Sequence, residues 1–409
     1  MSKKQKSVML AINIYVLVFL MTFITRVVTA YIGIDYPEIS SVEISNLVTF
    51  PSFFGMAAAL VIGPLSLKFG QVKLANMSIL FMVLHCVVYY LVGMFHAPFW
   101  MLHFGSFFGG VAIGSYIPLL NSIISKYFPA DRRANCIAQY NVFINIGGVV
   151  ITYAAGWLAA PNDGAQWYNA YLLGIAAIIG LVVFVVLTRK LDLDTPSIAE
   201  ASAAASGPKA KISDIPGKVF AWIILMGVVH GLFYVTQNAF NVNASPYIIT
   251  EYQLGTSVEA GTATSLVRFA LIPFTALYPV FKKILKDWMI PVGYLCMAIG
   301  LAIMMVSKSL VGAYACAVFC GLSTALVHSE FYAKASRYVP VALVAVATSV
   351  VSFLVNVGTG FSSYILEFFS NMLGGAMENN FLAGIIISVV IAVAALFMYV
   401  IKKPVQQVD

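Results

Sequence analysis

The sequence predicts an all-α, polytopic membrane protein with twelve transmembrane helices in two pseudo-symmetric six-helix bundles. Composition is the first observation: 61% of the 409 residues are hydrophobic and only 10% are charged, whereas a soluble domain carries about 25% charged residues. The apolar residues also come in runs of about 20, the length that a helix needs to cross a bilayer. Finally, Lys and Arg cluster between alternate pairs of runs.

Each run is read as a helix because backbone polar groups in lipid must be paired within the segment. Basic residues and prolines mark many of the ends. The first run follows Lys3, Lys4 and Lys6 and is too long for a signal peptide, so we expect it to be a retained helix. In order, the predicted spans are residues 9–33, 45–67, 74–95, 99–122, 135–158, 168–188, 218–241, 257–281, 289–307, 311–333, 341–366 and 381–401.

The distribution of basic residues predicts the orientation. With the N-terminus in the cytoplasm, all of the 23 Lys and Arg residues fall on the cytoplasmic side, except Lys308 in an outer loop and Arg26 and Arg268 inside spans. This is the positive-inside pattern. It predicts an integral plasma (cytoplasmic) membrane protein with both termini in the cytoplasm. It also explains the net charge of +7 as topology, so no nucleic acid partner is expected.

The chain divides into two similar halves. An Ala/Ser-rich stretch around 199–208 reads as a flexible linker. We therefore expect a six-helix bundle at 1–190, a cytoplasmic linker at 191–216 and a second bundle at 217–409. Sixteen residues separate Pro129 from Asn145 in the first half, and 16 separate Pro340 from Asn356 in the second. Duplicated halves with a site between them near the membrane midplane are a common transporter architecture.

With this layout, the chain resembles the major facilitator superfamily along its whole length. The family's loop between its second and third helices reads roughly G-x-L-x-D-R-x-G-R-K. Gly63, Leu65, Lys68 and Gly70 match it, and Leu67 stands where the Asp would be. The resemblance implies a secondary transporter that works by alternating access, in which this loop latches the cytoplasmic side through a charge relay. The missing Asp weakens that relay here.

Charges inside a span are expensive unless they are paired or hydrated, so they indicate function. Arg268 lies near mid-bilayer and has no acidic neighbour one helical turn away. Its planar fork of donors suits a carboxylate, and family branches that carry monocarboxylates, oxalate and nitrate are similar in placing an Arg on the eighth helix. Arg268 could instead pair with an internal acid. Arg26 is either a second anion contact or a residue that pairs with outer acids or snorkels outward.

Glu330 stands four residues before Lys334 and seven before Arg337, which places all three on one helical face. A cytoplasmic gate pair is the favoured interpretation, and a proton carrier is the alternative. His328 is a candidate for the same gating or proton-coupling role, although a lone membrane histidine is more often a hydrogen-bonded core residue. Lys68, Gly63 and Gly70 join this group through the loop described above.

Polar and aromatic side chains at inward spacing are the candidates for lining a substrate cavity. Together with Arg268 and Arg26, the predicted substrate-binding residues are Asn145, Asn356, Tyr153, Tyr234, Gln237, Asn241 and Tyr140. Helix packing is the alternative role for the two repeat-related asparagines. Gly110/Gly114 and Gly227/Gly231 are small-xxx-small pairs that let helices approach closely.

Several functions are excluded or disfavoured. The chain has no P-loop, no metal-ligand spacing and no catalytic triad pattern, so we expect a transporter that is not an enzyme and uses no cofactor or metal. The predicted function is secondary transport of a small organic anion, perhaps a carboxylate, as a proton symporter or anion exchanger. A multidrug or amphiphile efflux antiporter is the alternative. The expected partners are an anionic small molecule, membrane lipid and a proton, and the chain is expected to be a monomer.

Overall fold

The computed structural model describes residues 3–128, 130–160, 166–191, 193, 216–337 and 344–401, and several side chains near helix ends lie outside this description. The elements of the first half are α1 (Lys3–Phe19), the 3-10 helix η1 (Leu20–Phe23), α2 (Thr25–Asp35), α3 (Ser41–Thr49), α4 (Pro51–Phe69), α5 (Gln71–Met94), α6 (Trp100–Tyr127), α7 (Ala130–Ala159), η2 (Trp167–Leu173) and α8 (Gly174–Lys190).

The elements of the second half are α10 (Gly217–Pro246), the π-helical η4 (Tyr247–Glu251), α11 (Ser257–Ala276), α12 (Tyr278–Leu285), η5 (Lys286–Trp288), α13 (Met289–Ser307), α14 (Leu310–Arg337), α15 (Val344–Met372), α16 (Met377–Ala395) and η7 (Leu396–Ile401). Within the residues that the structure describes, each predicted span is therefore essentially helical, and the predicted fold class is confirmed.

Eleven helical segments in the described part of the chain are long and apolar enough to cross a membrane. The eighth predicted span, α11, is not among them. Its 20 residues include Glu259, Arg268 and several serines and threonines, which lower its mean hydropathy. A polar helix in this position faces protein or a cavity more readily than lipid.

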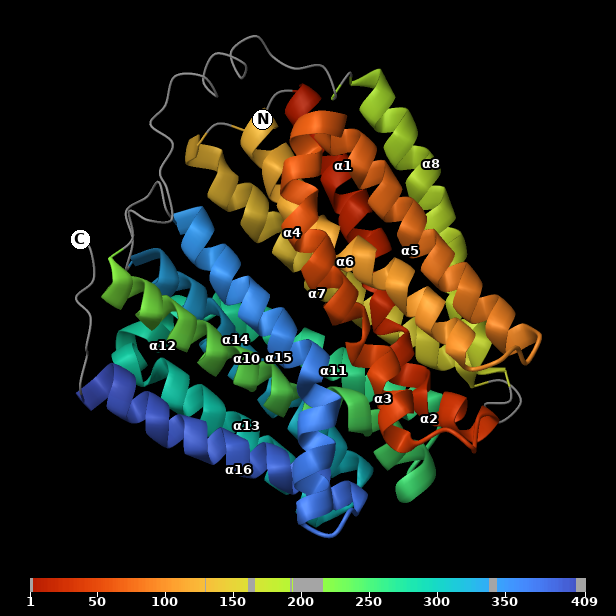
Figure 1. Ribbon diagram of the computed structural model, residues 1–409, viewed down its shortest axis with the longest axis vertical. Coiled ribbons are helices and arrows are strands. Elements are labelled where there is room, and N and C mark those ends of the chain that lie inside the picture. Colours follow the sequence, from red (N-terminus) through yellow and green to blue (C-terminus); the bar gives the residue numbers. More distant parts are fainter. Residues whose placement is uncertain are drawn as a thin grey trace.

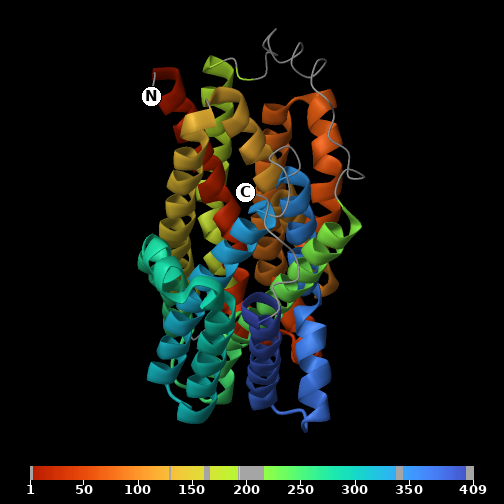
Figure 2. The same cartoon turned by 90° about the vertical axis from the view of Figure 1, so that its left-hand side faces the viewer.

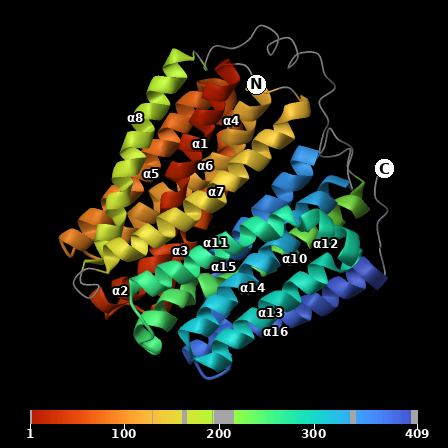
Figure 3. The ribbon, with the colours of Figure 1, turned by 180° about the vertical axis from the view of Figure 1, so that it is seen from behind.

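The helices form two lobes, each around its own hydrophobic core. One core draws its buried residues from positions 8–193 and the other from positions 222–395. Figure 1 shows the lobes side by side, with the red-to-yellow helices in one and the green-to-blue helices in the other, and Figure 3 shows the same division from behind. The linker prediction for 191–216 falls almost entirely outside the described residues.

Helices within a lobe approach closely where both partners carry glycine. A Cβ at Gly114 of α6 would lie 1.9 Å from the backbone oxygen of Gly55 in α4. In the other lobe, a Cβ at Gly358 of α15 would lie 2.2 Å from the backbone oxygen of Gly231 in α10. Small residues at such crossings let backbones pack directly against each other.

Hydrogen bonds join the two lobes on the side where α2 leads into α3, which we call the α2/α3 side. Thr49 Oγ1 lies 3.3 Å from Ser363 Oγ, and Ser245 Oγ donates to the Val27 carbonyl at 2.9 Å. Ser257 Oγ donates to the Gly156 carbonyl at 2.7 Å, where α11 crosses α7. In Figure 2, the helices stand roughly along the vertical axis, with α8 and the start of α1 toward the top.

Candidate functional site

A cavity of about 260 Å³ lies between the lobes. Residues from both halves line it, and the candidates among them are Arg26, Tyr234, Gln237, Asn241, Arg268, His328 and Asn356. The structure thus brings together, from five separate helices, seven side chains that the sequence singled out. The volume of the cavity lies just below the usual range for ligand sites, about 300 to 1,000 Å³, and suits a small molecule.

The two arginines contact one aromatic ring. The Arg268 guanidinium carbon is 4.2 Å from the centre of the Phe23 ring, and the Arg26 guanidinium carbon is 5.0 Å from it. A guanidinium within about 6 Å of a ring face is attracted to it by a cation–π interaction. Arg26 belongs to the first lobe and Arg268 to the second, so the cavity wall is cationic on both sides.

Local sequence places these side chains. Phe23 ends the 3-10 turn that interrupts the first span, and Arg26 follows in the first turn of α2. Thr22 Oγ1 donates to the Phe19 carbonyl at 3.2 Å, a local bond that competes with regular helix pairing. Across the interface, a Cβ at Gly148 would lie 3.4 Å from Arg268 Cγ. The glycine therefore leaves room for the arginine stem beside α7.

No aspartate or glutamate is among the described residues that line this cavity. The two guanidinium carbons lie no more than about 9 Å apart, the sum of their distances to the Phe23 ring centre. Two unit charges at that separation repel by roughly 2 kcal/mol at an effective dielectric constant of about 20. A bound anion would relieve this repulsion.

Amide and hydroxyl groups complete the wall. Tyr234 OH and His328 Nδ1 are hydrogen bonded at 2.8 Å, and Gln237 Nε2 donates to Thr324 Oγ1 at 2.7 Å. Asn241 Nδ2 donates to Asn238 Oδ1 at 3.1 Å. Sequence reasoning did not single out Phe23 as a lining residue, because one more phenylalanine among 29 carries no distinguishing signal.

Three predicted binding residues, all on α7, are not among the lining residues of this cavity. Tyr153 is 51% exposed, and Tyr140 is buried in the core of the first lobe. Asn145 is also buried, and its Oδ1 has no hydrogen-bond partner among the described residues. Their role in binding stays a prediction.

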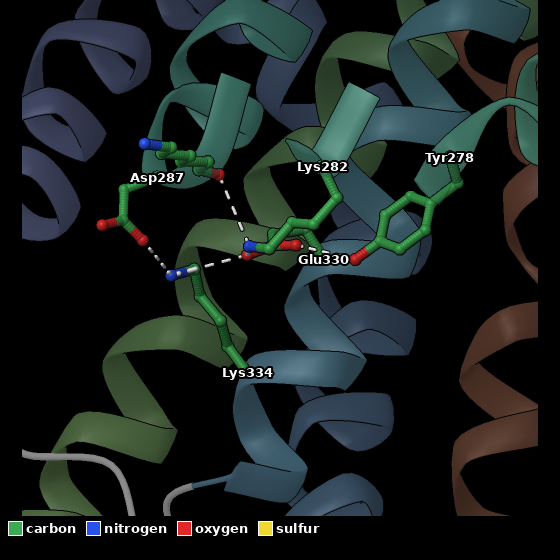
Figure 4. Close-up of polar contacts among 6 residues, drawn as sticks. Tyr278, Lys282, Asp287, Glu330 and Lys334 are labelled. Atoms are coloured by element: carbon green, nitrogen blue, oxygen red, sulfur yellow. Dashed lines mark hydrogen bonds and ion pairs between the residues drawn. The ribbon is translucent and has the colours of Figure 1, made fainter. Parts of the chain in front are cut away.

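Glu330 lies in a separate cluster of charges formed by residues of α12, η5 and α14 in the second lobe (Figure 4). It is 1% exposed and forms an ion pair with Lys282 of α12. Tyr278 OH donates to its Oε2 at 2.7 Å, and Lys334 Nζ lies 3.5 Å from its Oε1. Lys334 also donates to Asp287 at 3.2 Å. Glu330 therefore pairs with lysines and not with Arg268. Among the described residues, Arg268 forms no ion pair with an acid.

The loop motif of the first lobe is only partly described. Gly70 has φ of 83°, a left-handed conformation that favours glycine, and α5 begins directly after it. Gly63 and Lys68 lie outside the described side chains. The part that Gly63 and Lys68 play in gating stays a prediction.

Lys308, the basic residue that departs from the orientation pattern, is neutralised locally. It lies between α13 and α14 and forms an ion pair with Glu378 at the start of α16. The hydrogen bond to Glu378 raises the pKa of Lys308. Its charge is thus paired at the surface.

Comparison with known proteins decides the family. The family model described as Major Facilitator Superfamily matches residues 8–363. This chain belongs to the major facilitator superfamily. It is a multi-pass membrane protein of a transporter family.

Individual members of the superfamily are distant in sequence. A D-xylose transporter of Levilactobacillus brevis is 21% identical over 305 residues, which cover 67% of this chain and 64% of the relative, just under two thirds of its length. A crystal structure of a D-xylose-proton symporter covers 98% of both chains at 17% identity and a TM-score of 0.72. A peptide transporter POT in complex with alafosfalin covers 97% of this chain and 98% of its own at 14% identity and a TM-score of 0.76. These likenesses establish the shared fold.

Proposed function

We propose that this chain moves a small organic anion, most simply a carboxylate, across the membrane by alternating access. The observation that carries the proposal is the pair of guanidinium groups on the cavity wall, Arg26 and Arg268, with no acid among the described lining residues. A guanidinium binds a carboxylate through two parallel hydrogen bonds. The low dielectric of a membrane interior strengthens such an interaction.

The coupling that we propose is proton symport or anion exchange. His328 is the titratable lining residue that could carry a proton, and its ring nitrogen contacts the Tyr234 hydroxyl. In an exchange mechanism, a second anion would replace the first at the arginines and no proton would be needed. A substrate gradient imposed with and without a pH gradient separates these two modes.

A sugar is the second candidate substrate. The amide and hydroxyl wall, including Gln237, Asn241 and Asn356, offers donors and acceptors of the kind that bind sugar hydroxyls. The D-xylose relative supports the same class. A lipophilic cation, the cargo of the multidrug alternative, would meet two positive charges in this cavity, so the arginines argue against it.

Other expectations follow from the same proposal. We propose that the protein resides in the plasma membrane with both termini in the cytoplasm, because the basic residues gather on one side. We also propose that residues 1–190 and 217–409 rock as rigid bundles about the cavity, joined by the linker at 191–216. A monomer suffices, because both arginines come from one chain.

Uptake into proteoliposomes tests the proposal. Wild-type protein should take up radiolabelled small carboxylates from a panel of formate, acetate and succinate, and should not take up D-xylose. Arg268→Gln should abolish uptake although the variant still reaches the membrane and purifies as a monodisperse species. Normal carboxylate uptake by that variant, or uptake of D-xylose alone by the wild type, would overturn the anion assignment.

A further inference from the structure

Phe23 connects the two cationic residues of the cavity physically. Its ring centre lies 4.2 Å from the guanidinium carbon of Arg268 and 5.0 Å from that of Arg26. Without such a contact, two like charges in a cavity with no described acid would move apart. The ring face attracts both of them and so limits how far they can separate.

The contact also joins the two lobes. Phe23 and Arg26 flank the start of α2 in the first lobe, whereas Arg268 comes from α11 in the second. A guest with one carboxylate can form a bidentate contact with one guanidinium and leaves the other charge uncompensated. A guest with two acidic groups on a short skeleton can bind both and neutralise the cavity.

We propose that Phe23 is a positioning residue, which holds Arg26 and Arg268 at a spacing that selects a small dicarboxylate over a monocarboxylate. The inference rests on the anion transport proposed above and names the substrate class of that same site. The Phe23 side chain has no donor group that could bind a carboxylate. Its effect is on the geometry of the two arginines.

The cavity is consistent with a short doubly charged guest. Its volume of about 260 Å³ accommodates a small guest of this kind. Other lining residues, among them Gln237 and Asn356, carry amide groups that can donate to carboxylate oxygens. Neutral amide donors add hydrogen bonds without adding a third charge.

Equilibrium titration of the purified full-length chain with acetate, malonate and succinate tests the inference. The measured quantity is the ratio of the acetate Kd to the Kd of the better dicarboxylate. In the wild type, we expect a ratio of roughly ten or more, because a second charge-assisted contact contributes at least that factor. Phe23→Leu should bring the ratio close to one, and Phe23→Tyr, which keeps a ring face, should retain most of it.

Phe108→Leu is the matched control. Phe108 of α6 stacks on Phe81 of α5 in the same lobe and is not among the lining residues of the cavity, so its replacement removes an aromatic ring without removing the contact to either arginine. The ratio should stay at its wild-type value. If Phe23→Leu does not fold, Arg26→Gln replaces it, and this variant should lose the preference for dicarboxylates while acetate binding through Arg268 persists.

The outcomes separate the inference from the proposed function. If the wild type binds acetate as tightly as the dicarboxylates, or if Phe23→Tyr behaves like Phe23→Leu, the positioning role is wrong although anion binding survives. If the wild type binds none of the three acids, the anion proposal itself fails.

Discussion

Arg26, Arg268 and Glu330 show how charge inside the membrane divides between a cavity and a structural cluster. Sequence alone could find all three, because a charge within an apolar run is conspicuous. It could not assign their partners, because these depend on which helices pack together. Glu330 binds Lys282 and Lys334 rather than Arg268, and only the fold shows this. The repeat also treats Asn145 and Asn356 as equivalent, yet only Asn356 lines the cavity.

Replacing the buried acid should destabilise the second lobe. In Glu330→Gln, Lys334, which is 3% exposed, keeps its 3.2 Å ion pair with the partly exposed Asp287 but loses the charge of the buried Glu330 carboxylate 3.5 Å away. Removing one partner of a buried pair destabilises by about 3 to 5 kcal/mol. We expect an apparent Tm lower by several degrees, measured as the loss of monodisperse protein after heating. Lys283→Ala, a change at an exposed neighbour, should leave the Tm within a degree or two of wild type, and an equal loss in both variants would refute this role for Glu330.

The helices themselves were predictable, because long apolar runs must be helical in lipid. Their interruptions were not. The 3-10 turn at Leu20–Phe23 lies within a continuous apolar run, and hydropathy contains no sign of it. Such turns are set by tertiary contacts and often mark a hinge. The glycine pairs were visible as small-xxx-small spacing, but which helix each glycine meets emerged only from the fold.

One glycine crossing can be tested directly. Gly114→Ala would place a Cβ 1.9 Å from the backbone oxygen of Gly55, so α4 and α6 would have to separate. Overpacking of this kind typically destabilises by 1 to 3 kcal/mol, which should lower the apparent Tm. Gly33→Ala is the control, because its Cβ would meet nothing closer than 3.9 Å. A Gly114→Ala protein as stable as the Gly33→Ala protein would contradict the packing described here.

At the scale of the whole molecule, two lobes enclose the cavity of Arg26 and Arg268 and are joined on the α2/α3 side. The duplicated spacing predicted two halves, and the positive-inside pattern predicted how they thread the membrane. The rotation of each helix about its own axis was beyond sequence reasoning, since apolar residues face lipid and core alike. Sequence reasoning could therefore not distinguish Tyr140, which is buried in the core of the first lobe, from Tyr153, which is 51% exposed, and the binding role of both stays a prediction.

A cross-link between the lobes should arrest transport. Thr49 and Ser363 place their hydroxyl oxygens 3.3 Å apart across the interface, so Thr49→Cys combined with Ser363→Cys should form a disulfide on mild oxidation. The α2/α3 side would then stay closed, and substrate uptake should fall to background and return after reduction. Each single cysteine variant should transport normally under the same oxidation. Full activity of the cross-linked protein would contradict alternating access by separation of the lobes on this side.

Binding to the purified protein of two small molecules that match in skeleton but differ in charge tests the central claim most directly. Succinate and succinamide share a skeleton and differ in charge, and D-xylose represents the sugar alternative. The twin-arginine cavity predicts that succinate binds, that succinamide and D-xylose do not, and that the Arg26→Gln, Arg268→Gln double variant loses succinate binding. Tight binding of D-xylose or succinamide, or succinate binding that survives the loss of both arginines, would contradict it.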